Sequence, residues 1–415
     1  MNQLTRLLKP KSVAIIGAST KEMRAGNIIM KNLLHGGFEG IIMPVTPNHP
    51  AVCGVLAYRS VAELPVVPDV AIVCTHASRN IQIFHDLAAK KVKAAIVLSA
   101  DMHFPLDNGD SIQDRCLKIA KAAGMRILGP NSLGLVLPWE NFNASFSPVT
   151  AQKGKIAFIS QSAAMCTTIL DWANDKNIGF SAFVSLGNAL DIDFADLLDY
   201  LSTDSHTDAI LLYVDTISDA RRFMSAARAA SRNRRILVLK GGRTAAGRAA
   251  AKAHTGGSDT LDIIYDSAIR RTGMLRVKNS HELFAAVETL THSVPLRGER
   301  LAIITNGGGP AIMAVDTLLE RGGKLAQLSP DTIESLSEIL PPSWSHSNPI
   351  DIVGDADHTR YIKTLNAVMD ADCADAILIM HSPSAVAHSE QTAQAVVDAI
   401  KSHPRYKRFN ILTNW

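Results

Sequence analysis

The chain has 415 residues, of which 47% are hydrophobic and 20% charged, and its formal net charge is +3 at pH 7. Such a composition indicates a globular protein with a sizeable core and room for two to four domains. No apolar run reaches the roughly 20 residues that a membrane-spanning helix needs. No long basic run is present either, so we expect neither a membrane nor a nucleic-acid partner.

Short β-rich apolar runs alternate with amphipathic segments along the chain. Runs that are apolar throughout are typical of strands buried on both faces, as in parallel sheets covered by helices. The alternation predicts repeated βαβ units and a doubly wound α/β fold. The predicted strands lie at 13–17, 41–45, 70–74, 94–100, 126–129, 155–160, 209–215, 235–242, 301–309, 376–382 and 409–415.

Two polar, turn-rich segments, 138–154 and 292–300, interrupt this alternation and predict boundaries between units. The three predicted domains span 1–145, 150–292 and 296–415. The last predicted strand ends the chain where a loop and a helix ordinarily follow, so we expect the protein to continue beyond Trp415.

Five cysteines are scattered along the chain without CxxC spacing, which argues against a structural zinc site and against a disulfide framework. We therefore expect a reduced, cytoplasmic protein without a bound metal. The cysteines are Cys53, Cys74, Cys116, Cys166 and Cys373.

The turn Gly17-Ala18-Ser19-Thr20 follows the first predicted strand and opens a helix. Amides at such a turn, together with the helix N-terminus, can hold a pyrophosphate. The spacing from Gly17 to Gly26 is not GxGxxG, which disfavours a nicotinamide nucleotide. By pattern alone, a nucleotide-phosphate site and a plain strand–helix turn both stay open.

Two further strand-end loops are Pro44-Val45-Thr46-Pro47 and Asn131-Ser132. Each by itself is a turn motif. Because open α/β sheets bind ligands at the carboxyl ends of their strands, these loops and the Gly17 turn together favour one ligand crevice.

Two polar turns open later helices. Free amides at a helix N-terminus form an anion site, and we expect both turns to face one phosphate, a pairing that rests on their similarity alone. The first turn contains Ser160, Ser162, Ala163 and Ala164, and the second contains Asn306, Gly307 and Gly308.

His254 lies in the segment 240–260, which is rich in glycine and alanine and is expected to form a flexible loop. A loop histidine is most often merely solvated, but an imidazole nucleophile on a mobile loop would suit a phosphoryl relay. Asp215, at another strand end, is suited to orient that imidazole. Asp191 and Asp193 are expected to cap the next helix rather than to bind a metal.

The order of these motifs resembles the NDP-forming acyl-CoA synthetases, relatives of succinyl-CoA synthetase, along almost the whole chain. Other segments are similar to the N-terminal region of bacterial protein lysine acetyltransferases, in which a synthetase-like region precedes a GNAT domain. The first resemblance rests on GAS, PVTP, GPNSLG, SQSAA, SLGNALDIDFADLLDYL, KGGR, AHTGG, TNGGGP and NPID, and the second on NASFSP, ILDWA, SDARRFMSAARAASRN and HELFAAVETL.

The resemblance implies a Rossmann-like CoA-binding domain followed by two flavodoxin-like, succinyl-CoA synthetase-like parallel-sheet domains. It implies that Gly17 to Thr20 hold the CoA phosphates, and that Pro44 to Pro47, Ser99 and the Asn131-Ser132 loop line the CoA groove. The two polar turns would hold the transferred phosphate. His254, in AHTG where the family has SHTG, would be the phosphorylated histidine.

Three departures from the family pattern favour a loss of turnover, whereas His254 itself favours its retention. Asp215 stands where the family has glutamate, Ala163-Ala164 where a glycine is usual, and Gly257-Ser258-Asp259 where the family tends to LAG. The expected ligand is CoA or acetyl-CoA. ATP or ADP with Mg²⁺ is expected only through an ATP-grasp segment after Trp415, followed by a GNAT domain.

We therefore expect the acyl-CoA-binding, regulatory region of a bacterial protein lysine acetyltransferase. Acetyl-CoA would be its ligand or acyl donor, protein lysines the substrates of the full-length enzyme, and its assembly a homo-oligomer. The alternative is a working ADP-forming acyl-CoA synthetase core with a phosphohistidine relay. A third hypothesis is a non-enzymatic module that binds CoA or a nicotinamide nucleotide.

Overall fold

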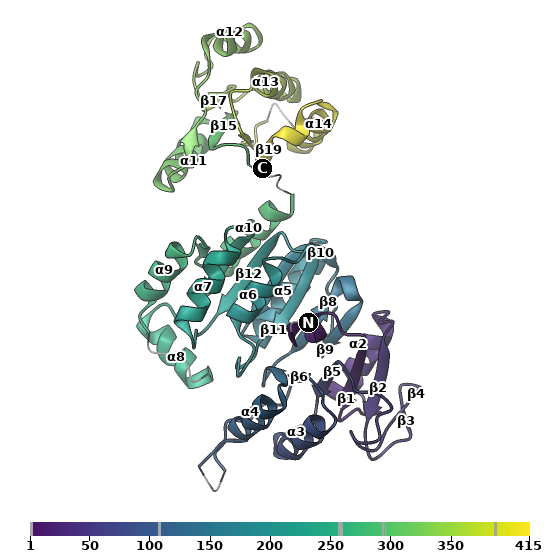
Figure 1. The fold of residues 1–415 in the computed structure, drawn as a ribbon. Helices are drawn as coiled ribbons and strands as arrows, with labels where there is room; N and C mark the ends of the chain where they lie inside the picture. The colour runs from purple at the N-terminus through teal and green to yellow at the C-terminus, as the bar shows by residue number, and fades with distance from the viewer. Residues whose placement is uncertain (1–2, 107–108, 256–259, 293, 295, 386–387) are drawn as a thin grey trace. The chain divides into compact units, whose positions relative to one another are not determined.

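The computed structural model describes residues 3–415 apart from 107–108, 256–259, 293, 295 and 386–387. The chain divides into two compact units, Met1–Thr291 (unit 1) and His292–Trp415 (unit 2). Each unit is an α/β structure and is described by itself (Figure 1).

Unit 1 begins with a parallel five-stranded sheet in the order β2-β1-β5-β6-β7. The residues of β1, β5 and β6 are all buried, as expected for apolar strands covered on both faces. The elements are α1 (Gln3–Leu8), β1 (Ser12–Ile16), α2 (Ala25–His35), β2 (Ile41–Val45), the small hairpin β3 (Ala51–Val52) and β4 (Val55–Leu56), β5 (Val70–Val73), α3 (Asn80–Ala89), β6 (Ala94–Val97), α4 (Ile112–Ala123) and β7 (Arg126–Leu128).

Unit 1 continues with a seven-stranded sheet in the order β14-β13-β12-β10-β11-β8-β9. Strand β8 pairs antiparallel with both β11 and the edge strand β9, and the other neighbouring strands pair parallel. The elements are β8 (Gly134–Leu137), β9 (Phe142–Ser145), β10 (Lys153–Ser160), α5 (Ala163–Asp175), β11 (Phe180–Ser185), α6 (Phe194–Leu201), β12 (Ala209–Val214), α7 (Ala220–Ala230), β13 (Arg235–Lys240), α8 (Ala245–Thr255), α9 (Asp262–Arg271), β14 (Leu275–Val277) and α10 (Ser280–His292).

Unit 2 contains a parallel sheet in the order β16-β15-β18-β19, with β17 also paired to β15. Helices α12, α13 and α14 contribute to its main core, whereas α11 packs in a smaller cluster with Ile303 and Met380. The elements are β15 (Arg300–Thr305), α11 (Gly308–Glu320), β16 (Lys324–Leu325), α12 (Pro330–Ile339), β17 (Ile350–Asp351), α13 (His358–Ala371), β18 (Ala376–Met380), α14 (Ser389–Ser402) and β19 (Asn410–Asn414).

The two sheets of unit 1 share one hydrophobic cluster, which contains Ile29 of α2 together with Phe142 of β9. The Phe38 ring packs edge-on against Phe142, with ring centroids 5.1 Å apart. On the same contact, Asn32 Nδ2 donates to the carbonyl of Ser145 at 2.9 Å. The first sheet is therefore fixed to the second through a common core.

The predicted α/β fold with parallel sheets is confirmed, and each predicted strand overlaps an observed one. Strands β8, β9 and β11 are absent from the prediction, as are the shorter strands β3, β4, β14, β16 and β17. The strand β9 (FNAS) lies inside the segment 138–154, which was predicted to be a polar boundary between units. Short antiparallel edge strands tolerate polar residues, so its polar composition did not indicate a strand. Serines interrupt the apolar run of β11 (FSAFVS).

The segment 240–260 was expected to be a flexible loop, and this is wrong for its middle part, where α8 forms. Alanine has the highest helix propensity, and the Thr244 hydroxyl accepts a hydrogen bond from the amide of Gly247 at 3.1 Å. The hydroxyl thus caps the first turn of the alanine-rich helix.

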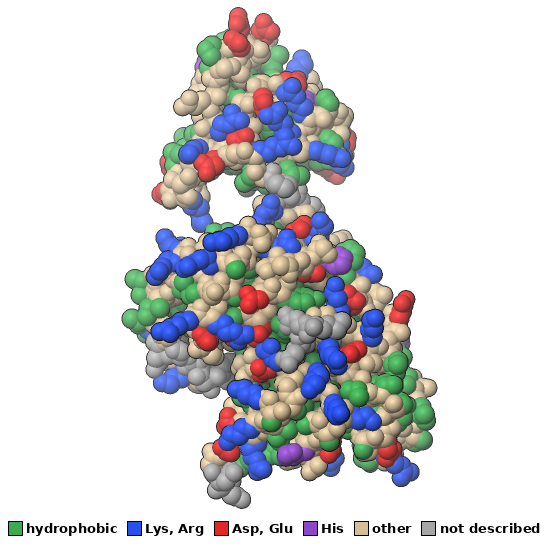
Figure 2. Space-filling view, in the orientation of Figure 1, with side chains coloured by type: hydrophobic (Ala, Val, Ile, Leu, Met, Phe, Trp, Pro, Cys, Tyr) green, Lys and Arg blue, Asp and Glu red, His purple; other side chains and the backbone are tan. Residues whose placement is uncertain are grey.

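On the face shown in Figure 2, Lys and Arg side chains are scattered among Asp and Glu over both units. This distribution agrees with the small formal net charge of +3. Within the described part of the chain, none of the helices combines the length and apolar character required to cross a membrane.

Candidate active site

The first candidate site surrounds the turn that follows β1. Gly17 has a φ of 89°, which favours glycine, and its amide donates to the carbonyl of Val45 at 3.0 Å. A Cβ on Gly26 would lie 2.3 Å from the Gly17 carbonyl oxygen. The close approach of α2 to this turn therefore requires a residue without a side chain at position 26.

The polar residues after the Gly17 turn are held by local hydrogen bonds. Thr20 Oγ1 lies 3.2 Å from His49 Nε2, and Asn27 Nδ2 donates to the carbonyl of Ser19 at 2.9 Å. The contact between Thr20 and His49 joins the turn after β1 to the loop after β2. The predicted loops Gly17–Thr20 and Pro44–Pro47 therefore lie together at one sheet edge.

Several predicted groove residues are buried and contribute through their backbone. Ala18, Val45 and Thr46 are at most 5% exposed. The amide of Thr46 donates to the carbonyl of Tyr58 at 2.8 Å. These three residues shape the loop, whereas Thr20 is the exposed polar side chain of the turn.

Ser99 belongs to a network across the ends of β5, β6 and β7. Its hydroxyl donates to the carbonyl of Thr75 at 2.7 Å and accepts from Asn80 Nδ2 at 3.0 Å. The carbonyl of Ser99 accepts from the amide of Asn131 at 3.0 Å. The structure thus brings Ser99 and Asn131 together at the carboxyl edge of the first sheet.

A continuous hydrogen-bonded chain leads from this edge to the second sheet. Ser132 Oγ donates to the carbonyl of Ser185 at 2.5 Å, and the amide of Leu186 donates to the carbonyl of Ser160 at 2.8 Å. Ser160 Oγ then donates to the carbonyl of Ser162 at 2.9 Å. Ser132 and Ser160 are at most 1% exposed, so their hydroxyls hold loops in place.

Helix α5 starts at Ser162, whose side chain accepts from the amide of Met165 at 3.2 Å. This cap leaves the amides of Ala163 and Ala164 in the first turn, where helix amides lack intrahelical acceptors. Free amides of this kind can bind an anion, so the anion site expected at this turn stays a prediction.

Asp215 is anchored next to this turn by a side chain that the sequence interpretation missed. Gln161 Oε1 accepts from the amides of Asp215 and Thr216, at 2.8 and 2.9 Å. Burial, the Asp215 charge and a hydrogen bond to Asp215 raise the pKa of Tyr213 to about 12, so the phenol stays protonated. A Cβ on Gly241 would lie 2.8 Å from both Asp215 Oδ1 and the Tyr213 hydroxyl.

The backbone of His254 lies in the last turn of α8. Its side chain, and the segment Gly257-Ser258-Asp259, lie outside the described residues. Lys240, at the end of β13, is 6% exposed, and its ammonium lies 4.6 Å from the centroid of the Tyr265 ring. Burial lowers the pKa of Lys240.

Unit 2 repeats the strand–turn–helix arrangement between β15 and α11. Thr305 Oγ1 donates to the carbonyl of Gly307, and the amide of Gly307 donates back to Thr305 Oγ1, both at 3.0 Å. Asn306 is 3% exposed and bonds through its side chain to both the amide and the carbonyl of Ser382. Gly308 begins α11. The two units are described separately, so a phosphate shared with Ser162 stays a prediction.

Asp191 and Asp193 have structural partners. Asp193 caps α6 in a capping box with Asp196, as expected, whereas the same expectation for Asp191 is wrong. Asp191 accepts from Arg126 Nε at 2.9 Å and from the amide of Ile127 at 2.8 Å. These bonds tie the loop after β11 to the start of β7.

Comparison with known proteins agrees with this architecture. Residues 11–138 match a CoA binding domain, 153–290 a succinyl-CoA ligase like flavodoxin domain, and 301–402 a ligase-CoA domain. The alpha subunit of acetate–CoA ligase [ADP-forming] I from Pyrococcus furiosus is 35% identical over 411 residues, which cover 97% of this chain and 88% of that protein. The chain belongs to the NDP-forming acyl-CoA synthetase family.

Two further members of the family show the same relationship. Acetate–CoA ligase [ADP-forming] I of Archaeoglobus fulgidus is 35% identical over 95% of this chain, which spans 57% of that relative. The solved structure of acetyl-coenzyme A synthetase 1 from Ca. Korarchaeum cryptofilum, in complex with phosphate and ADP, superimposes with a TM-score of 0.92 at 32% identity. That match covers 100% of this chain and 89% of the solved chain.

The expectation of a protein lysine acetyltransferase region is wrong. It is overturned by the ADP-forming acetate–CoA ligases that match nearly the whole chain. The segments that suggested it belong to structural elements, such as ILDWA in α5 and NAS of NASFSP in β9, and a likeness of such segments does not by itself carry a function. The alternative, an ADP-forming synthetase core, fits these relatives.

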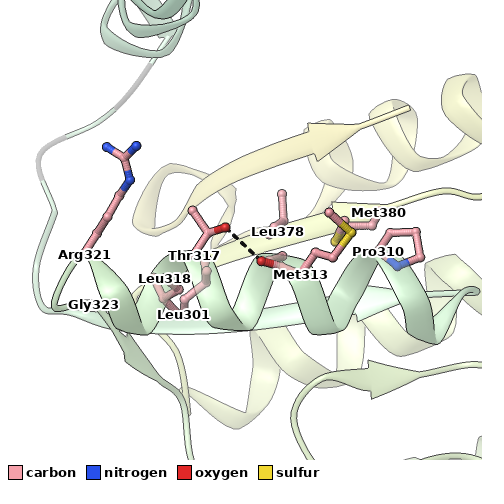
Figure 3. Close-up of a pocket in the computed structure, with 10 residues that line it drawn as sticks. Leu301, Pro310, Met313, Thr317, Leu318, Arg321, Gly323, Leu378 and Met380 are labelled. Carbon is pink, nitrogen blue, oxygen red and sulfur yellow. Dashed lines mark hydrogen bonds between the residues drawn. The ribbon is translucent and has the colours of Figure 1, made fainter. Parts of the chain in front are cut away.

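A separate hollow of about 560 Å³ lies on unit 2 between α11 and the sheet (Figure 3). Thr317 Oγ1 donates to the carbonyl of Met313 within α11 at 2.9 Å, so its polar atom is used inside the helix. Leu301, Leu378 and Met380 line the floor. This apolar lining does not suit a phosphate, which separates the hollow from the turn at Asn306.

Proposed function

We propose that this chain carries the acyl-CoA and phosphate steps of an ADP-forming acyl-CoA ligase, with acetyl-CoA as a substrate. The observation that carries the proposal is the 35% identity over 97% of the chain to an ADP-forming acetate–CoA ligase subunit. The nucleotide step, with ATP or ADP and Mg²⁺, would belong to an ATP-grasp segment or subunit. We further propose that the protein works in the cytoplasm.

In this proposal the edge of the first sheet binds CoA. The turn at Gly17 and Thr20 would hold the CoA phosphates by its amides and hydroxyl. The loops at Pro44–Pro47, Ser99 and Asn131 would line the path of the pantetheine arm. Their support is their position on one carboxyl edge, which is where open α/β sheets bind ligands.

The acyl phosphate would form at the turn that starts α5. A phosphate held by the amides of Ala163 and Ala164 would attack the thioester carbon. Helix N-termini stabilise the negative charge of the phosphate without a counter-ion.

His254 would then take the phosphoryl group. Its ring nitrogen would attack phosphorus, the bond from phosphorus to the acyl oxygen would break, and the carboxylate would leave. The Asp215 carboxylate would accept a hydrogen bond from the N–H of the other ring nitrogen and stabilise the phosphorylated ring. The hydrogen bonds from the Asp215 and Thr216 amides to Gln161 support this role, because they fix the carboxylate beside the α5 turn.

The proposal is tested by incubating residues 1–415 with acetyl-CoA and ³²P-phosphate. We expect release of CoA thiol and a base-stable, acid-labile label on the protein. His254→Asn should remove the label, whereas His85→Asn, on the CoA-side helix α3, should not. Labelling that survives His254→Asn, or no phosphate-dependent thiol release from the wild type, would contradict the proposal.

A further inference from the structure

The thioester of acyl-CoA must lie between two loops if the proposed function holds. The CoA groove ends at Asn131, and the phosphate turn begins at Ser160. The loop 185–188 joins these two points, since Ser132 Oγ donates to the Ser185 carbonyl and the Leu186 amide donates to the Ser160 carbonyl. Its exposed side chain is Asn188, because Ser185, Leu186 and Gly187 are buried.

Asn188 is held rigidly by its backbone. Its amide donates to the carbonyl of Pro130 at 2.9 Å, and the amide of Leu190 donates to the carbonyl of Gly129 at 3.0 Å. Gly187 has a φ of 56°, and a Cβ there would lie 2.1 Å from the Pro130 carbonyl oxygen. The two loops therefore pack backbone against backbone, and only glycine fits at their contact.

The residue after Asn188 adopts an unfavourable conformation. Ala189 has a φ of 49°, a left-handed value that non-glycine residues rarely adopt. The amide of Ala189 donates to the carbonyl of Leu186 at 3.1 Å, which closes a tight turn. This turn presents Asn188 to solvent at the carboxyl edge.

The side chains of Asn188 and Asn131 lie next to each other. Asn131 is also exposed and left-handed, with a φ of 56°. Asn131 Nδ2 lies 3.5 Å from Asn188 Oδ1, a long contact that leaves most of the capacity of both amides unused. Two neutral amides, one from each sheet, thus flank the path from the CoA groove to the phosphate turn.

We propose that Asn131 and Asn188 form a paired-amide site for the acyl-thioester end of acyl-CoA, in which Asn188 donates an N–H to the thioester carbonyl oxygen. The inference rests on the proposed function. Neutral amide donors suit an uncharged carbonyl in the bound substrate, and they bind it more strongly as the oxygen becomes negative. Free CoA has no acyl carbonyl, so it would bind without the Asn188 bond.

The chemical step balances with this assignment. An oxygen of HPO₄²⁻ attacks the thioester carbon, and the carbonyl electron pair moves to the oxygen that Asn188 faces. The pair then returns, the C–S bond breaks, and the proton of the phosphate passes to the departing sulfur. The products are acyl phosphate and CoA thiol. Asn188 stabilises the tetrahedral intermediate without gaining or losing a proton.

The test compares Asn188→Ala with Asn233→Ala, an exposed asparagine in the turn after α7. Calorimetric titration of residues 1–415 should show that Asn188→Ala weakens acetyl-CoA binding by about 3- to 10-fold, as for one lost hydrogen bond, and leaves CoA binding within about 2-fold. Phosphate-dependent thiol release should fall by about 10²-fold in kcat, as for one oxyanion donor. Asn233→Ala should match the wild type in all three.

The variant Ala189→Gly distinguishes a merely structural role of Asn188 from a role in binding. It keeps the side-chain amide of Asn188 and relieves the left-handed strain at position 189. This variant should keep the wild-type preference between acetyl-CoA and CoA. Equal weakening of both ligands in Asn188→Ala, or unchanged binding of both, would overturn the paired-amide site. The titrations need no turnover, so a wild type that binds acetyl-CoA but releases no thiol counts against the proposed function alone.

Discussion

The second sheet of unit 1 and the sheet of unit 2 use one strand–turn–helix device with different chemical groups. After β10, Ser160 bonds to both polar atoms of the Ser162 backbone, and after β15, Thr305 does the same for Gly307. In both turns a hydroxyl on the last strand residue shapes the entry into the helix. The conformation of the turn is therefore specified by the strand end, not by the glycine content of the helix start.

The middle residue of each turn anchors the loop after the neighbouring strand. Gln161 accepts from the amides that follow β12, and Asn306 accepts from the Ser382 amide that follows β18. The anchored residue is a carboxylate, Asp215, in one sheet and a hydroxyl, Ser382, in the other. The same backbone arrangement thus positions a carboxylate in unit 1 and a neutral hydroxyl in unit 2. For this reason we assign the role of orienting the His254 imidazole to Asp215 alone.

The strand pairs β10–β12 in unit 1 and β15–β18 in unit 2 also correspond at their amino ends, opposite the turns. Asp208 pairs with Lys155 at 3.1 Å, and Asp375 pairs with Arg300 at 2.9 Å through two hydrogen bonds. The Asp208 side chain is 55% exposed, whereas that of Asp375 is 10% exposed. The planar guanidinium allows the bidentate geometry that an ammonium cannot supply.

Replacing the anchored carboxylate should have the largest effect on activity. Asp215→Asn removes the group proposed to orient His254, and the rate of histidine labelling from acetyl-CoA and phosphate should fall by about 10²-fold or more. Asp208→Asn, at the other end of the same strand, is the matched control and should label at the wild-type rate. Equal rates for both variants would remove the functional distinction between Asp215 and Ser382.

Removing the anchors tests whether the two turns are equivalent in stability. Asn306 is 3% exposed, and Asn306→Leu leaves the partly buried amide and carbonyl of Ser382 unpaired, at a cost of about 3 kcal/mol of unfolding free energy in unit 2. Gln161→Leu should cost about 2 kcal/mol in unit 1, because Gln161 is only partly buried. Denaturant titration and calorimetry would measure the unfolding free energy of both variants. A larger loss for Gln161→Leu than for Asn306→Leu would contradict the assignment of the stronger anchor to Asn306.

The caps of the two helices differ, since Ser162 caps α5 with its side chain whereas Gly307 gives α11 no side-chain cap. Ser162→Ala should therefore cost about 1 kcal/mol of stability. Thr168→Ala, on the exposed side of the same helix, should cost less. Phosphate affinity should fall in the first variant only, as measured by titration of phosphate against protection from thermal unfolding.

The smallest expected effect concerns pH. The hydrogen bonds from Arg300 lower the pKa of Asp375 to about 2, below the unfolded value of about 3.9. The pair therefore stabilises unit 2 fully above about pH 4, and this contribution is lost as the pH falls toward 2. Solvent around Arg300 limits it to about 1 kcal/mol. Asp375→Asn should remove this part of the acid dependence, and an unchanged acid profile would contradict it.

The strand pattern and the ligand-bearing turns were predictable from sequence because apolar runs and strand-end glycines act locally. The anchors were not. Gln161 stands between the two serines of SQSAA, but the amides that donate to it lie 54 and 55 positions further along the chain, and single-sequence patterns carry no such distances. Likewise, the helix α8 was missed because the glycines of the segment 240–260 masked its favourable alanine content. Asn188 was missed because its partner Asn131 follows a strand of another sheet.

The core shared by the two sheets of unit 1 also limits how such a protein can be recombined. Phe142 and Leu135, on the edge strands of the second sheet, belong to the same apolar cluster as Ile29 of the first. A graft that moved only the N-terminal sheet into another ligase would cut through this cluster and expose apolar surface on both sides of the join. The smallest cassette that can exchange the proposed thioester site between relatives is therefore the whole of Met1–Thr291.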